Sequence, residues 1–278
     1  MIQPTKKSPV ICWWSGGVTS AVACKIALDL YGADNCRAIF IDTKNEDGDT
    51  YRFLKDCQNW YGLEIEKITA IGKKYNSIQD VWHDYNSLNV AKGAICSSEL
   101  KRQVRIDFQR RNKFSAQVFG FDCDEINRAK NIKKNYPASL PIFPLLLHVL
   151  SKKECIKIIQ SSNIEIPRMY ALGFHNNNCF RTGCVQGGIG YWKKIQKEFP
   201  AKFDTMASLE HNLTDSKGKP VTMLKDQSKE AKVTGNVKVF LKKHPKYPHL
   251  KCIDDMKGQE VKPLLECNGF CGIQGTLF

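Results

Sequence analysis

The stretch VICWWSGGVTSAVAC, residues 10–24, joins an apolar run to two adjacent glycines and three hydroxyl residues. The apolar run predicts a buried strand, and the small residues after it predict a tight turn into a helix. Glycine lets the main chain approach a ligand closely, and the N–H groups at a helix start favour a negative charge. Residues 15–20 are therefore predicted to hold a phosphate or sulfate group, with an ordinary strand-to-helix turn as the alternative.

The pattern around this stretch predicts an α/β fold, because apolar β-branched runs alternate with helical patterns. The predicted strands are residues 10–14, 38–43, 64–71 and 116–121, and the predicted helices are residues 19–31, 50–61, 77–88 and 97–111. Such alternation predicts a mainly parallel, Rossmann-like sheet with helices on both faces. Ligands of these sheets bind beyond the carboxyl ends of the strands. Residues 15–20 and the pair Asp42 and Thr43 are expected together at that edge.

Composition limits the class of protein. The 278 residues, 42% of them hydrophobic, are enough to bury a sizeable core. The formal net charge of +14 favours polyanionic partners, either nucleic acid or nucleotides, with simple solubility as the alternative. No apolar run approaches the ~20 residues of a membrane helix, and residues 1–10 lack the apolar core of a secretory signal. We therefore expect a cytoplasmic protein with no membrane partner.

The middle of the chain carries both helix signals and a long irregular passage. Ser151 and Glu154 stand at capping-box spacing and predict a helix start. Residues 163–192 are dense in Asn, Gly and Cys, which favours a functional loop. A further helix is predicted at residues 191–198, ended by Pro200.

The end of the chain is basic. Between Lys217 and Lys262 there are twelve lysines and five acidic residues, with Phe240 and Tyr247 among them. Such a region is predicted either to follow a nucleic-acid backbone and stack its bases or to form a solvated charged face. The sequence thus predicts a nucleotide-binding domain at residues 1–200 and a basic region at residues 201–278.

The glycine loop resembles the PP-loop of the adenine nucleotide α-hydrolase superfamily, whose usual form is S-G-G-x-D-S. It is not the Walker A loop, G-x-x-x-x-G-K-[ST], because no lysine stands at the corresponding position. Thr19 stands where the superfamily usually has an aspartate, which removes a carboxylate. The resemblance assigns the anion to Ser15, Gly16, Gly17, Thr19 and Ser20.

Further stretches resemble phosphoadenosine phosphosulfate (PAPS) reductases, in the same order over about residues 10–185. AIFIDTKNEDGDTYRFLKDCQNWYGLEIEKI, residues 38–68, resembles their strand ending in Asp-Thr, acidic loop, helix and Tyr-Gly-Leu. AICSSELKRQVRIDF, FGFDCDEINRAKN and IPRMYALGFHNNNCFRTGCV resemble three later segments of that family. The matching residues beyond the glycine loop are Asp42, Thr43, Thr50, Phe53, Cys96, Leu100, Lys101, Gly120, Glu125, Arg128, Pro167, Tyr170, Gly173, Phe174, Cys179 and Cys184.

The resemblance implies an adenine nucleotide as ligand, whether PAPS, adenylyl sulfate or ATP. It places Asp42 at the ribose or the adenine edge, with a strand-end capping role as the alternative. Arg128 offers a planar fork and Lys101 a point charge to a sulfate or phosphate, while a solvated surface charge is the alternative for each. The nucleotide-binding residues implied beyond the glycine loop are Asp42, Thr43, Lys101, Gly120, Glu125 and Arg128.

Three cysteines form the first sulfur signal. Some relatives bind a [4Fe–4S] cluster through a Cys-Cys pair and a later Cys-x-x-Cys, whereas this chain has a single Cys96 and a C-x4-C pair, Cys179 and Cys184. The alternatives are a three-cysteine cluster with one open iron, a zinc site with His175 as the fourth ligand, and three reduced thiols lining a pocket.

The tail LLECNGFCGIQG, residues 264–275, is the second sulfur signal. PAPS reductases end in Glu-Cys-Gly-aliphatic-His, whose thiolate attacks the sulfonate sulfur. Here Cys267 and Cys271 resemble that tail, but an insertion splits it and Gln274 replaces the histidine that would lower the thiol pKa. Cys271 as nucleophile, a Cys267–Cys271 redox pair, added metal ligands and a structural knuckle remain open.

The resemblance implies an enzyme of sulfur metabolism that reduces an adenylyl sulfate by thiol attack, with Cys271, Cys267 and Cys96 as catalytic residues and a thioredoxin-type reductant as partner. The first alternative is an ATP-dependent sulfurtransferase that adenylates a nucleic-acid base and replaces its oxygen with sulfur. The second alternative is a nucleotide-binding regulator without turnover.

Overall fold

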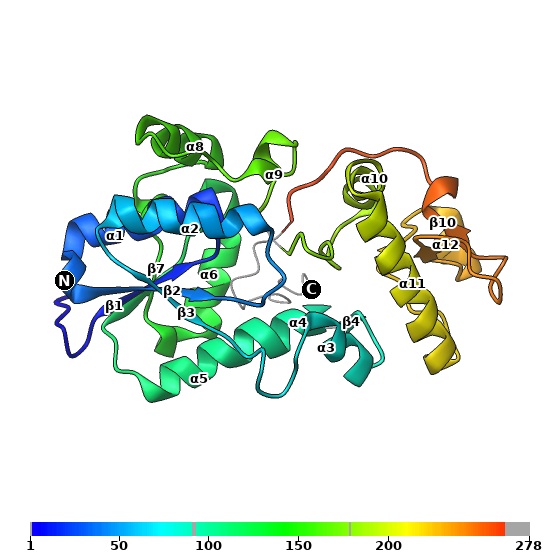
Figure 1. Cartoon of the computed structure of the whole chain (residues 1–278), viewed down its shortest axis with the longest axis horizontal. Coiled ribbons are helices and arrows are strands. Elements are labelled where there is room, and N and C mark those ends of the chain that lie inside the picture. The colour runs from blue at the N-terminus through cyan, green and yellow to red at the C-terminus, as the bar shows by residue number, and fades with distance from the viewer. Residues whose placement is uncertain (1, 91–92, 178, 265–278) are drawn as a thin grey trace.

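The computed structural model describes residues 2–90, 93–177 and 179–264, and in these residues five parallel strands form the main sheet (Figure 1). Across the sheet the strands are β3 (Ile65–Ile68), β2 (Cys36–Ile41), β1 (Val10–Trp14), β6 (Ala116–Val118) and β7 (Pro141–Ile142). The chain proceeds from β1 to β2 and β3 on one side, and then to β6 and β7 on the other. The strand order therefore reverses beside β1, which is where such sheets bind ligands.

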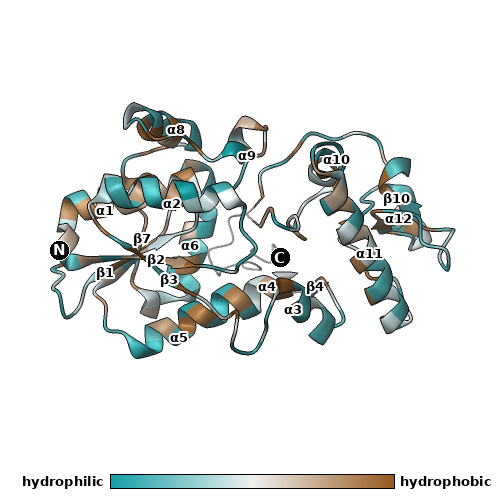
Figure 2. Cartoon of the chain, viewed as in Figure 1, coloured by the Kyte–Doolittle hydropathy of each residue, from teal (hydrophilic) through white to brown (hydrophobic). Residues whose placement is uncertain are grey.

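Helices cover both faces of this sheet, as the sequence predicts. Helices α1 (Val18–Tyr31), α2 (Gly48–Tyr61) and α8 (Lys152–Ser161) pack on one face, in a core that includes Cys12 and Trp14. Helices α5 (Gln103–Arg111) and α6 (Ile126–Asn135) pack on the other face with Ile11 and Trp13. Successive residues of β1 thus enter opposite cores, because side chains alternate along a strand. Figure 2 shows hydrophobic residues along the strands between these two helix layers.

Several elements are shorter or more divided than the sequence predicts. Strand β6 ends at Val118, so Phe119 to Phe121 begin a loop. The helix predicted at residues 97–111 consists of α4 (Ile95–Ser97), a π-helical segment Ser98–Arg102, and α5. A π-helical segment inside an α-helix is a rare feature that is frequent at functional sites.

The capping box at Ser151 is present, since its hydroxyl accepts from Glu154 N and the Glu154 carboxylate accepts from Ser151 N. Pro200 occupies the first turn of a new helix rather than only ending the previous one, because proline fits at that position without losing a hydrogen bond. The remaining elements are α3 (Ile78–Asp84), β4 (Asn89–Val90), β5 (Gly93–Ala94), α7 (Pro144–Leu147), α9 (Arg168–Ala171), α10 (Ile189–Glu198), α11 (Pro200–Lys217), β8 (Leu224–Lys225), α12 (Lys229–Thr234), β9 (Lys238–Phe240) and β10 (Lys251–Cys252), with short 3-10 turns at Ala33–Asn35, Cys123–Glu125, Pro137–Ser139 and Ile253–Asp255.

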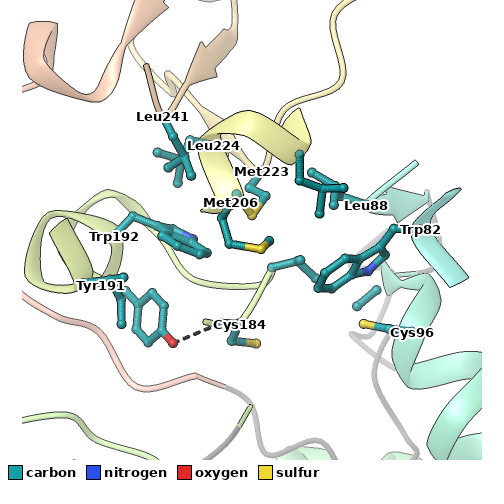
Figure 3. Close-up of a cluster of buried hydrophobic side chains, with 14 of the residues drawn as sticks. Trp82, Leu88, Cys96, Cys184, Tyr191, Trp192, Met206, Met223, Leu224 and Leu241 are labelled. Atoms are coloured by element: carbon teal, nitrogen blue, oxygen red, sulfur yellow. Dashed lines mark hydrogen bonds between the residues drawn. The ribbon is translucent and has the colours of Figure 1, made fainter. Parts of the chain in front are cut away.

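A second hydrophobic core lies apart from the sheet and joins α3, α10 and α11 with β8 and β9 (Figure 3). It includes Trp82, Trp192 and Met206, which come from both sides of residue 200. We call residues 200–264 the C-terminal unit; the division of the chain at residue 200 stays a prediction. Among the described residues, none of the helices combines the length and the apolar character that crossing a bilayer requires.

A buried carboxyl group organises the C-terminal unit. Glu210 of α11 is fully buried and accepts hydrogen bonds from Met223 N and Leu241 N, each at 2.7 Å. These contacts anchor the small sheet of β10, β9 and β8 to the helix. Burial raises the pKa of Glu210 to about 8, although both main-chain hydrogen bonds act to lower it.

Candidate functional site

The glycine loop lies directly after β1, at the reversal of strand order. Gly16 has φ +88°, and a Cβ atom there would lie 2.9 Å from Cγ2 of Thr50. A residue with a side chain at this position would therefore have a strained backbone and a steric clash. Gly17 caps α1 without a side-chain hydrogen bond. The loop folds around the Ser20 hydroxyl, which accepts from Ser15 N at 3.0 Å and donates to Gly17 O at 2.9 Å. The local geometry therefore requires glycine at position 16.

Two side chains from a distant segment hold this loop in place. Tyr170 of α9 accepts a hydrogen bond from Val18 N through its hydroxyl, at 3.3 Å. Asn177 donates through Nδ2 to Gly16 O at 2.9 Å and to Thr50 Oγ1 at 3.0 Å. Among the described residues Asn177 Oδ1 has no partner although it is buried. The asparagine therefore presents a buried acceptor next to the loop.

The loop after β6 contacts the start of α1. A Cβ atom on Gly120 would lie 2.5 Å from Ser20 Cα and 2.9 Å from Thr19 C, both main-chain atoms that cannot move independently. Glycine is thus required at position 120 for this close approach. Further along, Arg128 pairs with Glu125 at 2.5 Å and lies 4.7 Å from the Phe121 ring centre.

The loop after β2 is polar yet buried. Asp42 is 1% exposed and accepts from Lys44 N at 2.8 Å and from the Tyr51 hydroxyl at 2.9 Å, while Lys44 Nζ lies 2.9 Å from Oδ2. Burial alone raises the pKa of Asp42, but the hydrogen bonds from Lys44 and Tyr51 outweigh it, so the pKa lies below its usual value. Asp42 is therefore a carboxylate at neutral pH.

Lys101 reaches this same loop from the π-helical segment. Its ammonium lies 3.8 Å from the buried carboxylate of Glu46, which also accepts from the Thr43 hydroxyl at 2.9 Å. Burial raises the pKa of Glu46, opposed by Lys101 and reinforced by the charge of Asp42. The structure thus brings Asp42, Thr43 and Lys101 together with Glu46, while their role in nucleotide binding stays a prediction.

The cysteine-bearing segment is tied to the loop after β2. Asp47 accepts both hydrogen bonds of the Arg168 fork, each at 2.7 Å. Asn45 donates through Nδ2 to Thr182 Oγ1 at 2.8 Å, and Arg181 N donates to Asn45 O at 3.0 Å. These contacts fix residues 179–184 against the carboxyl edge of the sheet.

The cysteines predicted to bind metal lie in and around the second core. Cys96 and Cys184 both belong to it, and the Tyr191 hydroxyl accepts from Cys184 N at 3.0 Å (Figure 3). Burial raises the pKa of Tyr191, and the nearby thiols of Cys184 and Cys179 raise it further. Within the described residues, however, no three His, Cys, Asp or Glu side chains are arranged to hold a metal ion.

His175, considered above as a zinc ligand, is exposed, and its main-chain oxygen accepts from Lys152 Nζ at 3.1 Å. The described residues therefore do not fit a [4Fe–4S] cluster or zinc, and we assign no step to either.

A segment from the C-terminal unit returns to the glycine loop (Figure 1). Lys193 Nζ of α10 donates to Met256 O at 2.6 Å, and a Cβ atom on Gly190 would lie 2.3 Å from Glu260 O, so residues 256–260 lie against α10. Leu264 N then donates to Asn176 Oδ1 at 2.8 Å. Since Asn177 bonds Gly16, the chain at residue 264 reaches the neighbourhood of the loop.

Cys267 and Cys271 lie outside the described residues. Cys267 follows Leu264, the last described residue, by three positions in the sequence. The roles assigned to these two thiols stay predictions.

Sequence reasoning missed the residues that assemble the site. Glu46, Arg168 and the asparagines at 176 and 177 had no assigned role, although the run NNN at residues 176–178 lies within the segment IPRMYALGFHNNNCFRTGCV. An asparagine run in a loop is usually solvated, and the burial of Asn176 and Asn177 became visible only in the fold. As a whole, the site offers main-chain N–H groups and cations for an anion, carboxylates for a nucleoside, and nearby thiols.

The sequence of the chain matches a family model and is similar to known proteins. A family model described as the phosphoadenosine phosphosulfate reductase domain matches residues 9–186. An uncharacterized protein of Methanocaldococcus jannaschii is 26% identical over 208 residues, which are 70% of this chain and 40% of that protein. The chain thus spans less than half the length of this curated relative. The solved phosphoadenylyl-sulfate (PAPS) reductase from Candida auris, a phosphate complex, has a TM-score of 0.45 and 13% identity, over 59% of this chain and 78% of that one.

Proposed function

The chain belongs to the phosphoadenosine phosphosulfate reductase domain family, and from this premise we propose that it binds an adenine nucleotide and reduces an adenylyl sulfate by thiol attack. The glycine loop, Ser15 to Ser20, holds the phosphate or sulfate oxygens through main-chain N–H groups. Asp42 and the Gly120 loop hold the nucleoside. Lys101 supplies a positive charge that Glu46 keeps in position.

The chemistry proposed for the tail balances as follows. The Cys271 thiol loses its proton, its sulfur bonds to the sulfonate sulfur, and the S–O bond to the nucleotide breaks. The electron pair of that bond leaves on the nucleotide phosphate. A second thiol, that of Cys267 or of a thioredoxin-type reductant, then attacks the Cys271 sulfur, releasing sulfite and leaving a disulfide that the reductant reduces.

The observation that carries the proposal is the pair of hydrogen bonds at adjacent asparagines. Asn176 Oδ1 holds the chain that leads to the tail cysteines, and Asn177 Nδ2 holds Gly16. One dipeptide therefore contacts both Leu264, which precedes the tail in the sequence, and the loop proposed to hold the anion. This connection supports a thiol acting at the glycine loop, because effective catalysis requires the reacting groups to be held together.

The direct test is thioredoxin-dependent release of sulfite from PAPS and from adenylyl sulfate. We expect Cys271→Ser to abolish release and Cys267→Ser and Cys96→Ser to reduce it, while Cys252→Ala, which removes a thiol of the C-terminal unit, leaves it within about twofold. Unchanged release by Cys271→Ser refutes the tail nucleophile. Tight nucleotide binding with neither sulfite nor pyrophosphate release identifies a regulator instead.

A second candidate function is ATP-dependent sulfur transfer to a nucleic-acid base. The specific observation that favours it is a group of lysines in the C-terminal unit with no acidic partner among the described residues. Pyrophosphate release from ATP that depends on added RNA or DNA tests it. Anaerobic purification with an absorbance spectrum and metal analysis tests the cluster prediction separately, since iron with acid-labile sulfide supports it and a colourless, metal-free protein removes it.

A further inference from the structure

Two lysines of the C-terminal unit stand directly opposite each other in a sheet. Strands β8 and β9 are antiparallel, and their register pairs Lys225 with Lys238. Side chains of directly opposed residues lie on the same face of the sheet, only about 5 Å apart at Cβ, and like charges in this position are destabilising. The register therefore concentrates positive charge at an energetic cost.

Lys217 and Lys219, at the end of α11, join this pair. The pKa of Lys238 is lowered first by burial and then by the charges of Lys217, Lys219 and Lys225, which are therefore close to it. Lys238 Nζ donates to Pro220 O, and Lys217 Nζ donates to Asn86 O at 2.7 Å, so two of the four side chains are fixed. We call Lys217, Lys219, Lys225 and Lys238 the lysine patch.

Aspartates of the same unit pair with other lysines. The ion pairs are Asp204 with Lys242 at 2.8 Å, Asp215 with Lys246 at 2.6 Å, Asp226 with Lys251 at 2.8 Å, and Asp255 with Lys243 at 2.8 Å. Glu210 is buried and holds main-chain N–H groups. In the part of the chain that the structure describes, no carboxylate forms an ion pair with the lysine patch. The unit therefore contains one group of lysines whose charges are neutralised by aspartates. The second group, the lysine patch, forms no ion pair with a carboxylate among the described residues.

We propose that the lysine patch binds the phosphodiester backbone of a nucleic acid. Repeated phosphates match a set of like charges spread over a helix end and two strands, and neutralising them releases counterions and relieves the repulsion between Lys225 and Lys238. A membrane surface fits less well, because lysine-rich membrane-binding surfaces also present an apolar face. Among the described residues of the unit, Val233 is the large apolar side chain that is strongly exposed.

The test compares two quadruple variants that remove the same charge. The first changes Lys217, Lys219, Lys225 and Lys238 to glutamine; the matched control changes the ion-paired Lys242, Lys243, Lys246 and Lys251 to glutamine. Binding of short labelled single-stranded and duplex oligonucleotides is measured by fluorescence anisotropy over a range of salt. We expect the first variant to lose at least about tenfold in affinity and to lower the duplex salt slope by about 3, and the control to stay within about threefold. Equal losses in both variants overturn the proposal.

Further measurements distinguish nucleic acid from other sources of phosphate and keep the test valid if the quadruple variant misfolds. Inorganic phosphate and vesicles of phosphatidylserine are tested alongside; binding of the wild type to vesicles but not to oligonucleotides overturns the proposal. If the quadruple variant fails to fold, Lys219→Gln with Lys225→Gln keeps both lysine–carbonyl hydrogen bonds, and an unchanged affinity in this double variant also overturns it. Sulfite release from PAPS should be equal in all folded variants. The proposal that the lysine patch binds nucleic acid and the proposed reaction can therefore be refuted independently of each other.

Discussion

Buried carboxylates in two regions of the molecule face different partners. At the carboxyl edge of the sheet, Asp42 lies beside Lys44 of the same loop, and Glu46 lies beside Lys101 of the π-helical segment. In the C-terminal unit, Glu210 faces two main-chain N–H groups, and its pKa rises to about 8. The contrast separates a site in which carboxylates face side-chain cations, which a ligand can also contact, from a carboxyl group that holds main-chain N–H groups in place.

The largest effect that tests this comparison is expected from Gly120→Ala. Its Cβ atom meets the main chain of Ser20 at 2.5 Å, so the β6 loop must move away from α1. We expect a loss of about 3 kcal/mol or more in the free energy of unfolding and loss of nucleotide binding, measured by urea denaturation and calorimetry.

The control for this variant is Gly48→Ala. A Cβ atom on Gly48 meets no other atom within 4 Å, so we expect a change within about 0.5 kcal/mol and normal binding. Nucleotide binding by Gly120→Ala at wild-type affinity contradicts the placement of the β6 loop in the site.

Glu210→Leu tests the other region. It leaves Met223 N and Leu241 N without an acceptor, so we expect about 2–3 kcal/mol of destabilisation and faster hydrogen exchange at β8 and β9, with the main sheet unchanged. An equal increase of hydrogen exchange in the main sheet and in β8 and β9 contradicts the separation of the two regions.

The pH dependence of stability follows from the carboxyl group of Glu210. The folded pKa of about 8 lies above the ordinary value of 4.5, so the folded state binds more protons than the unfolded state between these values. Stability therefore falls as pH rises from about 4.5 to 8, by a few kcal/mol at most. Glu210→Gln should flatten this part of the profile, and an unaltered profile in the variant contradicts the assignment.

The asparagine dipeptide gives a smaller, divided effect. Asn176→Ala removes the acceptor of Leu264 N, so we expect turnover to fall about tenfold with nucleotide affinity within about twofold. Asn177→Ala releases Gly16 O and should weaken affinity about tenfold. Each variant serves as the control for the other when turnover is measured by kinetics and nucleotide affinity by calorimetry. Identical changes in turnover and affinity in both variants show that the dipeptide acts only on folding.

Two ion pairs give the smallest effects. Arg168→Ala leaves the buried Asp47 without its bidentate partner, at a cost of about 1 kcal/mol. Lys242→Ala breaks a pair in which both side chains are half exposed, and the change should stay below about 0.5 kcal/mol. Denaturation of both variants in parallel checks this order, and a reversed order contradicts it.

Much of the fold was predictable because it depends on local patterns. β1, α1 and the capping box at Ser151 follow from apolar periodicity and hydroxyl spacing. The π-helical segment at Ser98–Arg102 was not predictable, because its residues fit an ordinary helix and tertiary contacts decide the form. The small sheet of β8, β9 and β10 has strands of two or three residues, which are too short to show a period.

For the site, sequence patterns indicated single positions but not their partners. The juxtaposition of Asp42 with Thr43 follows from adjacency, whereas the contact of Lys101 with Glu46 joins residues that lie far apart in the chain. The roles assigned to the individual site residues stay predictions. The tail cysteines lie outside the described residues, so their part in the chemistry depends on the experiments above.

Hydrogen exchange of the wild-type protein with and without PAPS tests the central claim, that the reversal of strand order beside β1 binds the nucleotide. We expect PAPS to slow exchange at residues 15–20, 42–50 and 119–128, with β8 and β9 unchanged. Protection confined to the C-terminal unit, or no protection at saturating PAPS, contradicts the account.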